Sequence, residues 1–302
     1  MSEIHSRGGQ PRILLLTLVF APDSVSTAVI MTELVLQLRR FGHDFVVVTT
    51  TPHYNQDPET LAAQPLTPRW GSLLLQSDYR GIPVYHARVQ EKGKRIIARL
   101  LDYLNFHVIG TLAGLWLGGD YDVVLAPSPP LTIGLSAIAL AAFRRVPFIY
   151  NVQEIYPDIA VSLGVLRHRP LIRALEWMER LIYQRAQAIV VISERFRQRL
   201  LAKGVPAQKL YVIPNFVDVD FIRPGERLNS FSQQHQLDES FVVLYAGNIG
   251  LTQDFETIIG AAQALRDLPS LCFLIVGDGA RRDWLARQIT ELQLPNVRLL
   301  PY

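Results

Sequence analysis

The segment from Val242 to Ile259 places the strongest constraint on the fold, because it runs from a buried strand through a glycine turn into an amphipathic helix. An apolar run ends at the turn 247–250, and apolar side chains then recur at helical spacing from Phe255 onward. The same succession of strand, glycine turn and helix returns over 271–287. Such a turn directs backbone N–H groups and the positive end of a helix at a phosphate. The two units therefore predict half of a nucleotide-binding α/β domain.

Glycine at these turns has a second explanation, since a strand-to-helix turn can need glycine only for a positive φ angle. Neither turn matches the pattern G-x-G-x-x-G or G-x-x-x-x-G-K-[ST], which argues against a dinucleotide site and against a P-loop. The residues alone leave open whether the turns are structural or bind phosphate, and they do not identify the phosphate.

The N-terminal part of the chain has the same alternation of strands and helices. Continuous apolar runs, which are typical of buried parallel strands, predict strands over 12–21, 45–50, 84–87, 122–126, 147–152 and 188–192. Helical periodicity predicts a helix capped by Ser26, helices over 131–143 and 173–185, and a helix capped by Ser193. A loop is expected over 51–69. A strand at 210–213 is expected to open the second domain, so that the 302 residues divide into domains 1–210 and 211–302.

Polar residues follow the predicted strand at 147–152. Gln153, Glu154, Tyr156 and Asp158 come directly after it. Ligands of an open parallel sheet bind outside the carboxyl ends of its strands. We therefore expect these side chains to contact a substrate.

The charge balance favours an anionic partner. The net charge is +3 and the isoelectric point is about 9.0, which suits an anionic substrate or lipid surface. No nucleic acid is expected, because basic and aromatic residues are not interleaved in one patch. The single cysteine, Cys272, lies in a predicted buried strand, so we expect a reducing compartment and no disulfide framework. No apolar run reaches the length of about 20 residues that a membrane span requires.

The basic segment at 92–99 has two explanations. Lys92, Lys94, Arg95 and Arg99 lead into a run with apolar residues at 96, 97, 100, 101 and 104. An amphipathic helix that lies on an anionic membrane has this pattern. A core-packed helix with a solvated basic start has it too, so both explanations stay open.

Metal chemistry is not expected. D-x-D triplets at 120–122 and 218–220 have a spacing that can hold a divalent ion between oxygens. Each triplet borders a strand, however, where aspartate commonly begins or ends a turn. Four histidines lack the spacing of metal ligands, and we interpret them as surface or strand-end residues: His43, His53, His86 and His107.

An ordered set of motifs extends across nearly the whole chain. These are F-A-P (20–22), F-G-H (41–43), N-V-Q-E-I-Y-P-D (151–158), V-I-S-E (191–194), Y-V-I-P-N-F-V-D (211–218), Y-A-G-N-I-G (245–250) and V-G-D-G (276–279). In this order and spacing the chain resembles the retaining GT-B glycosyltransferases of family 4, especially those that build bacterial surface polysaccharides. The resemblance implies an α/β fold with two Rossmann-like domains that face a cleft. The first would bind a lipid-linked or saccharide acceptor, and the second a nucleotide sugar.

The resemblance also implies roles for individual residues. The donor diphosphate would face Gly247, Asn248 and Gly250, the nucleoside would lie beside Gly277, Asp278 and Gly279, and Arg282 or Arg281 and Asn215 would complete the donor site. Glu154 and Asp158 would be the catalytic residues on the acceptor side. In a retaining transfer of this kind the leaving diphosphate accepts the proton of the acceptor, so no protein nucleophile is needed. The nucleotide sugar is a substrate, and no cofactor is expected.

The sequence departs from the family pattern at several positions. Asn248 and Gln253 stand where many members have arginine and lysine, and Ser26-Thr27 replace a glycine pair. The E-x7-E glutamate pair of the donor site is absent, so the resemblance implies a second domain that is incomplete. A non-catalytic subunit that binds an acceptor or a partner is the alternative. The expected location is the cytoplasm, at the inner face of the membrane if the basic helix binds lipid.

Overall fold

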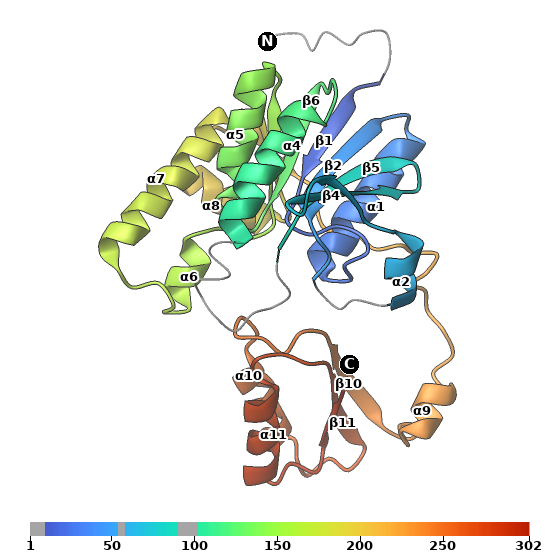
Figure 1. Ribbon diagram of the computed structural model, residues 1–302. Helices are drawn as coiled ribbons and strands as arrows, with labels where there is room; N and C mark the ends of the chain where they lie inside the picture. Colours follow the sequence, from blue (N-terminus) through green and yellow to red (C-terminus); the bar gives the residue numbers. More distant parts are fainter. Residues whose placement is uncertain (1–9, 54–57, 90–101, 302) are drawn as a thin grey trace. The chain divides into compact units, whose positions relative to one another are not determined.

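The computed structural model describes residues 10–53, 58–89 and 102–301. It divides into two compact units between Val217 and Asp218. Each unit has its own sheet (Figure 1). Each also has its own apolar core.

The first unit is built on a nine-stranded sheet in the order β3-β4-β5-β2-β1-β6-β7-β8-β9. Its strands are β1 (Arg12–Leu16), β2 (Asp44–Thr50), β3 (Thr67–Trp70), β4 (Leu74–Tyr79), β5 (Ile82–Ala87), β6 (Val123–Ser128), β7 (Phe148–Val152), β8 (Ala188–Val191) and β9 (Leu210–Val212). The seven strands β5-β2-β1-β6-β7-β8-β9 pair with their neighbours in parallel. β3 and β4 form an antiparallel extension at one edge.

Helices cover both faces of this sheet. They are α1 (Ser26–Arg40), α2 (Pro58–Ala63), the π-helical turn η1 (Phe106–Gly110), α4 (Thr111–Trp116), α5 (Ile133–Arg144), α6 (Asp158–Ser162), α7 (Arg169–Arg185), α8 (Glu194–Ala202) and the short η2 (Ala207–Lys209). Leu14 and Tyr150 belong to a core shared with α5 and α7, whereas Leu15 and Val47 pack with α1 on the opposite face. Because helices cover both faces of the sheet, β1 is apolar throughout after its first residue. A strand exposed on one face would alternate apolar and polar residues.

Most of the predicted elements of the first unit are confirmed within a few residues. Ser193 caps α8 as predicted, because its Oγ accepts a hydrogen bond from the N–H of Phe196. The predicted cap at Ser26 is wrong: this residue is the first of α1, and Val25 precedes it without a side-chain bond. The expected loop over 51–69 contains α2 and the start of β3. β3 and β4 were not predicted, because Pro68 and the polar side chains of β4 break the apolar pattern.

Strand β9 corrects the predicted domain boundary. The sequence predicts that residues 210–213 open the second domain. Instead, β9 pairs in parallel with β8 and completes the first sheet, with Ile189 opposite Leu210. A strand of three residues carries too little pattern to indicate which sheet it joins.

The second unit has a three-stranded parallel sheet in the order β10-β11-β12. Its elements are α9 (Ser230–Gln234), β10 (Phe241–Ala246), α10 (Phe255–Ala264), β11 (Leu271–Val276), α11 (Arg282–Glu291) and β12 (Val297–Leu300). Phe255 and Leu285, from the two longer helices, share a core with Phe273 and Ile275 of the central strand. The arrangement of strand, turn and helix predicted for this part of the chain is confirmed, and Cys272 is buried.

His86, expected at the surface or at a strand end, is the second-to-last residue of β5 and is fully buried. Its Nδ1 lies 2.9 Å from the Thr50 carbonyl oxygen and its Nε2 lies 2.7 Å from Ser77 Oγ. Gln64 Nε2 in turn donates to Ser77 Oγ over 2.8 Å. Burial lowers the pKa of His86 to about 4, so the ring is neutral at pH 7. The carbonyl can only accept, so Nδ1 carries the proton and Nε2 accepts from the serine hydroxyl.

Candidate functional site

The two glycine turns of the second unit lie against each other. They follow β10 and β11, which are parallel neighbours. The N–H of Ile249 in one turn donates to the carbonyl oxygen of Asp278 in the other over 2.8 Å, and the Arg281 N–H donates to the Ile249 carbonyl over 2.9 Å. A Cβ on Gly277 would lie 1.9 Å from the Gly247 oxygen. Glycine is therefore required here by the close approach of two backbones, whatever the turns bind.

Two backbone N–H groups of these turns are held by nearby side chains. Gly250 N–H donates to Gln253 Oε1 over 3.1 Å, and Gly279 N–H donates to Asp278 Oδ1 over 2.7 Å. Side-chain oxygens of this kind can rotate away, whereas the N–H of Gly247 is fixed by the carbonyl of Val276 in the sheet. An anion at the turns would therefore find two donors that become free through a side-chain rotation. This role of Gln253 was not predicted, since its spacing from Gly250 is that of an ordinary turn.

Arg281 and Arg282 differ in how they are engaged. Arg281 binds Glu256 through contacts of 2.8 and 2.5 Å, and its guanidinium lies 3.7 Å from the centre of the Trp284 ring. The hydrogen bonds from Arg281 hold the pKa of Glu256 below its usual value. Arg282 is the first residue of α11, and among the described residues its guanidinium has no carboxylate partner. Arg282 is thus the cation available beside the turns.

Two carboxylates at the start of α10, Asp254 and Glu256, would repel a phosphate at the turns, but local contacts engage both. Asp254 Oδ1 accepts from the N–H of Thr257, so it acts as the N-cap of α10. Glu256 is neutralised by the arginine of the neighbouring turn. Neither carboxylate is left as an uncompensated charge facing the turns.

Polar side chains gather at the carboxyl edge of the first sheet. Asn215, which follows β9, donates through Nδ2 to Gln153 Oε1 over 2.8 Å, and Gln153 Nε2 donates to Asn151 Oδ1 over 3.0 Å. The N–H of Gln153 donates to Ser128 Oγ over 3.3 Å. Asn215 therefore lies in the first unit, whereas the other residues predicted to bind the donor lie in the second. Its contact with Gln153 spans 62 positions, and the sequence carries no signal for it.

Glu154 lies in this group of residues with its carboxylate unpaired. It follows β7 and is half-buried, and burial raises the pKa of its carboxyl. No hydrogen bond or ion pair joins this carboxylate to the described residues. Burial, and then the charge of Glu154, raise the pKa of the nearby Tyr156. A half-buried carboxylate without a counter-ion costs stability, which is typical of a residue kept for a functional role.

Asp158, which is predicted to be catalytic together with Glu154, is engaged differently from it. Lys203 Nζ lies 2.6 Å from Asp158 Oδ1, and Arg199 Nε lies 2.9 Å from Oδ2. Burial alone would raise the pKa of Asp158, but hydrogen bonds from Lys203 and Arg199 hold it below its usual value. Lys203 also binds the buried Glu179 at 2.7 Å. These ion pairs join α6, α7 and α8, so Asp158 positions the helix that follows Glu154.

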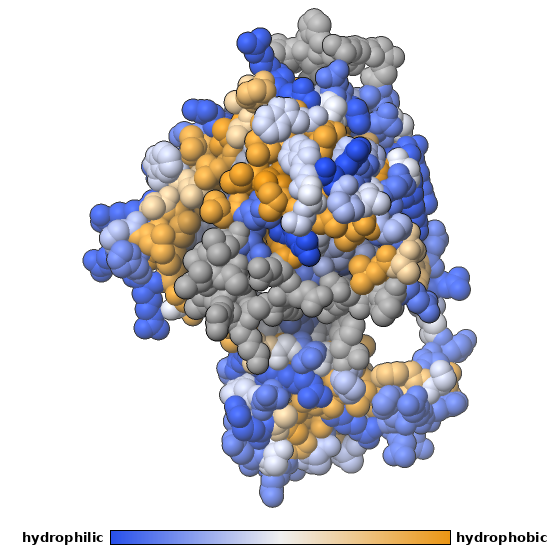
Figure 2. Space-filling view, in the orientation of Figure 1, coloured by the Kyte–Doolittle hydropathy of each residue, from blue (hydrophilic) through white to orange (hydrophobic). Residues whose placement is uncertain are grey.

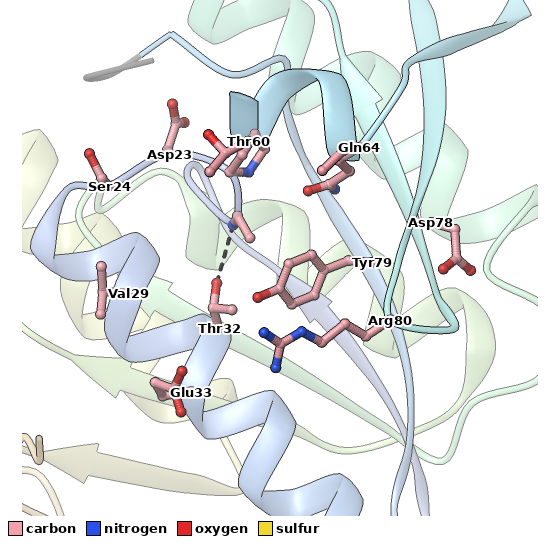
Figure 3. A pocket seen from close by; sticks show the side chains of 13 residues that line it. Asp23, Ser24, Val29, Thr32, Glu33, Thr60, Gln64, Asp78, Tyr79 and Arg80 are labelled. Atoms are coloured by element: carbon pink, nitrogen blue, oxygen red, sulfur yellow. Dashed lines mark hydrogen bonds between the residues drawn. The ribbon is translucent and has the colours of Figure 1, made fainter. Parts of the chain in front are cut away.

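A cavity of about 470 Å³ opens beside the loop that follows β1 (Figure 3). Its polar lining includes Asp23, Glu33, Gln64, Asp78 and Arg80, together with the ring of Tyr79. The N–H of Ala21 donates to Thr32 Oγ1 over 3.1 Å and so ties the loop to α1. Carboxylate oxygens accept hydrogen bonds from hydroxyl groups, and an aromatic ring offers an apolar face. The cavity suits a polyhydroxylated ligand. Three separate segments of the chain form it, so no local sequence pattern indicates it.

The described residues contain no group of three or more metal-ligating side chains that could hold an ion. Asp122 accepts from the N–H of Arg12 over 2.8 Å, and Asp218 Oδ1 accepts from the N–H groups of Asp220 and Phe221. Each D-x-D triplet thus has a structural use. The basic residues predicted to meet a membrane, Lys92, Lys94, Arg95 and Arg99, lie outside the described residues.

Comparison with known proteins gives three findings. The family model of the glycosyl transferase 4-like domain matches residues 27–215. The putative colanic acid biosynthesis glycosyl transferase WcaI of Escherichia coli K12 is 23% identical over 300 residues, which are 96% of this chain and 71% of that protein. Anabaena HepE, solved with UDP and glucose, superposes with a TM-score of 0.67 at 16% identity, over 97% of this chain and 70% of that one.

A second solved structure agrees with this fold. Sucrose-phosphate synthase from Thermosynechococcus elongatus superposes with a TM-score of 0.66 at 14% identity, over 97% of this chain and 70% of that one. The structural matches confirm the predicted α/β class with parallel sheets, as found in GT-B glycosyltransferases.

Proposed function

Because the chain belongs to the glycosyl transferase 4-like family, we propose that it moves a sugar from a nucleotide sugar to a lipid-linked or saccharide acceptor in cell-surface polysaccharide biosynthesis. WcaI is described as a transferase of colanic acid biosynthesis, and HepE was solved with UDP-glucose. Both descriptions support this choice of donor and product. The observation that carries the proposal is the pair of interlocked glycine turns, with two releasable N–H donors and Arg282 beside them.

The donor side of the reaction is assigned to these turns. The residues of the second unit proposed to surround the donor are Gly247, Asn248, Gly250, Gly277, Asp278, Gly279 and Arg282. A phosphate oxygen replaces the Gln253 side chain on the Gly250 N–H and gains the positive end of α10. Fixed donors and a cation then stabilise the charge that develops on the leaving diphosphate.

The acceptor side is assigned to the first unit. Glu154 accepts a hydrogen bond from a neighbouring hydroxyl of the acceptor, and so positions the hydroxyl that attacks the anomeric carbon of the donor sugar. The bond from that carbon to the diphosphate oxygen breaks, the new glycosidic bond forms on the same face, and the hydroxyl proton passes to the leaving diphosphate. Configuration is retained and no cofactor takes part. The cavity shown in Figure 3 holds further hydroxyl groups of a saccharide acceptor.

The proposal is tested by transfer assays with the 302-residue chain, UDP-, GDP- and ADP-sugars, and a set of saccharide and lipid-linked acceptors. Glu154→Gln should lower the transfer rate about tenfold to a hundredfold, the value of a hydrogen bond to a charged group, while donor affinity is unchanged. Glu59→Gln, at an exposed position in α2, is the matched control. Proton NMR of the product should show the donor's anomeric configuration. Donor binding without transfer to any acceptor would instead support the non-catalytic partner subunit.

A further inference from the structure

In the helical layer formed by α4, α5 and α7, the outer side of α5 is unusually apolar. The three helices pack on the same face of the first sheet, with α5 between the other two. Figure 2 shows apolar side chains gathered over them. α5 carries no charged residue before Arg144, and the side chains that it leaves exposed include Leu135, Ala139 and Phe143, the last at 72%. A helix that is apolar on all sides is normally covered, so this layer has the composition of a contact surface.

Two exposed tryptophans lie on this layer. Trp116 is the last residue of α4 and is 66% exposed, and Trp177 on α7 is 62% exposed. An indole combines a large apolar ring with a polar N–H group. Tryptophan is for this reason enriched where apolar lipid meets water. Their exposure in the same layer as the apolar side of α5 points to a lipid partner.

The exposed charges of the layer are mainly positive. α7 exposes Arg169, Arg173, Arg180 and Arg185, against the single exposed carboxylate of Glu176. Arg173 and Arg180 lie four residues before and three residues after Trp177, so they flank its ring on one face of the helix. Arginines around an apolar centre complement the negative surface of an anionic membrane. A symmetric contact with a second copy would instead bring these arginines of the two chains together.

We propose that this α4–α5–α7 face, centred on Trp116, Phe143 and Trp177, docks on the surface of a bilayer that contains anionic lipid. The apolar side chains enter the boundary between headgroups and acyl chains, and the arginines of α7 bind the headgroups. Among the described residues no helix is long and apolar enough to cross a membrane. The proposal uses none of the residues assigned to sugar transfer and does not depend on them.

The test is co-sedimentation of the 302-residue chain with vesicles of phosphatidylcholine alone or with about one third phosphatidylglycerol, at about 0.1 M salt. The chain should bind the anionic vesicles and bind neutral ones much more weakly. Trp177→Ser combined with Phe143→Ser should weaken binding at least about tenfold. Arg173→Gln should weaken it about fivefold. Circular dichroism should show that these surface variants remain folded.

Matched controls on the opposite face of the sheet separate this surface from others. Phe41→Ser and Arg40→Gln lie at the end of α1, where Phe41 is 73% exposed, and they should leave vesicle binding unchanged. Failure of the wild-type chain to bind anionic vesicles would overturn the proposal. So would vesicle binding that the α7 and α5 substitutions do not change, since another segment would then make the contact. A dimer in light scattering that these substitutions dissociate would assign the face to a second copy.

Discussion

Acidification from pH 7 to pH 4.5 should destabilise the first unit through the buried imidazole of His86. Burial holds the pKa of the folded residue at about 4, whereas the unfolded chain titrates near the ordinary value of about 6.5. Below about pH 6.5 the unfolded state binds a proton that the folded state does not. The free energy of unfolding therefore decreases as the pH is lowered, and it levels off below about pH 4. The loss should reach about 2.5 kcal/mol at pH 4.5, since each pKa unit is worth about 1.4 kcal/mol.

Urea unfolding at pH 7, 6, 5 and 4.5 measures this loss. His86→Gln is the comparison, because the amide retains a donor and an acceptor but does not titrate. The variant is expected to be less stable than the wild-type chain at pH 7. The comparison uses only the change in unfolding free energy with pH, so the stability that the variant loses at pH 7 does not affect it. Between pH 7 and pH 4.5 the free energy of unfolding of the variant should fall by about 2.5 kcal/mol less than that of the wild type. Equal losses would show that the buried histidine does not control the pH dependence.

Two pairs of substitutions test the packing around the proposed sites. Lys203→Met should cost about 3 kcal/mol, because it leaves the buried Glu179 without its counter-ion. Arg199→Met, at a side chain that is 62% exposed, should cost less than about 1 kcal/mol. If both variants lost the same unfolding free energy in urea, Lys203 would not be the main counter-ion of this cluster. Gly277→Ala should destabilise the second unit by about 1–3 kcal/mol, since its Cβ would meet backbone. Gly260→Ala, in open space on α10, should stabilise the second unit by about 0.5–1 kcal/mol. Thermal unfolding in which the two alanine variants have the same stability would refute this account.

The elements predicted best are those whose pattern is local and strong. Strand β11, with the sequence LCFLIV, and strand β12 were placed with their observed bounds, because continuous apolar runs between turns have few alternatives. The β3–β4 extension was missed, because an edge hairpin tolerates Pro68 and polar side chains that no central strand would. β9 was assigned to the second domain, because the sequence of a single strand does not show which other strand it pairs with.

The candidate site was predicted in part. The glycine turns were located, but their interlocking came only from the structure, since it depends on the register of β10 beside β11. Glu154 was singled out by its place after a strand, and its unpaired carboxylate supports a functional role. Asp158 was singled out by the same reasoning, and in the structure it forms ion pairs with Lys203 and Arg199. Its partner Lys203 lies 45 residues away on another helix, so only the folded chain reveals that contact.

The most direct test of the proposed transferase is a thermal-shift titration of the 302-residue chain with UDP-, GDP- and ADP-sugars. One nucleotide series should stabilise the folded protein by about 2.7 kcal/mol when the ligand is present at 100 times its dissociation constant. Arg282→Gln should weaken this response more than Arg281→Gln, because Arg281 is already bound to Glu256. A folded sample that responds to none of the three series would contradict the assignment of the glycine turns as the donor site.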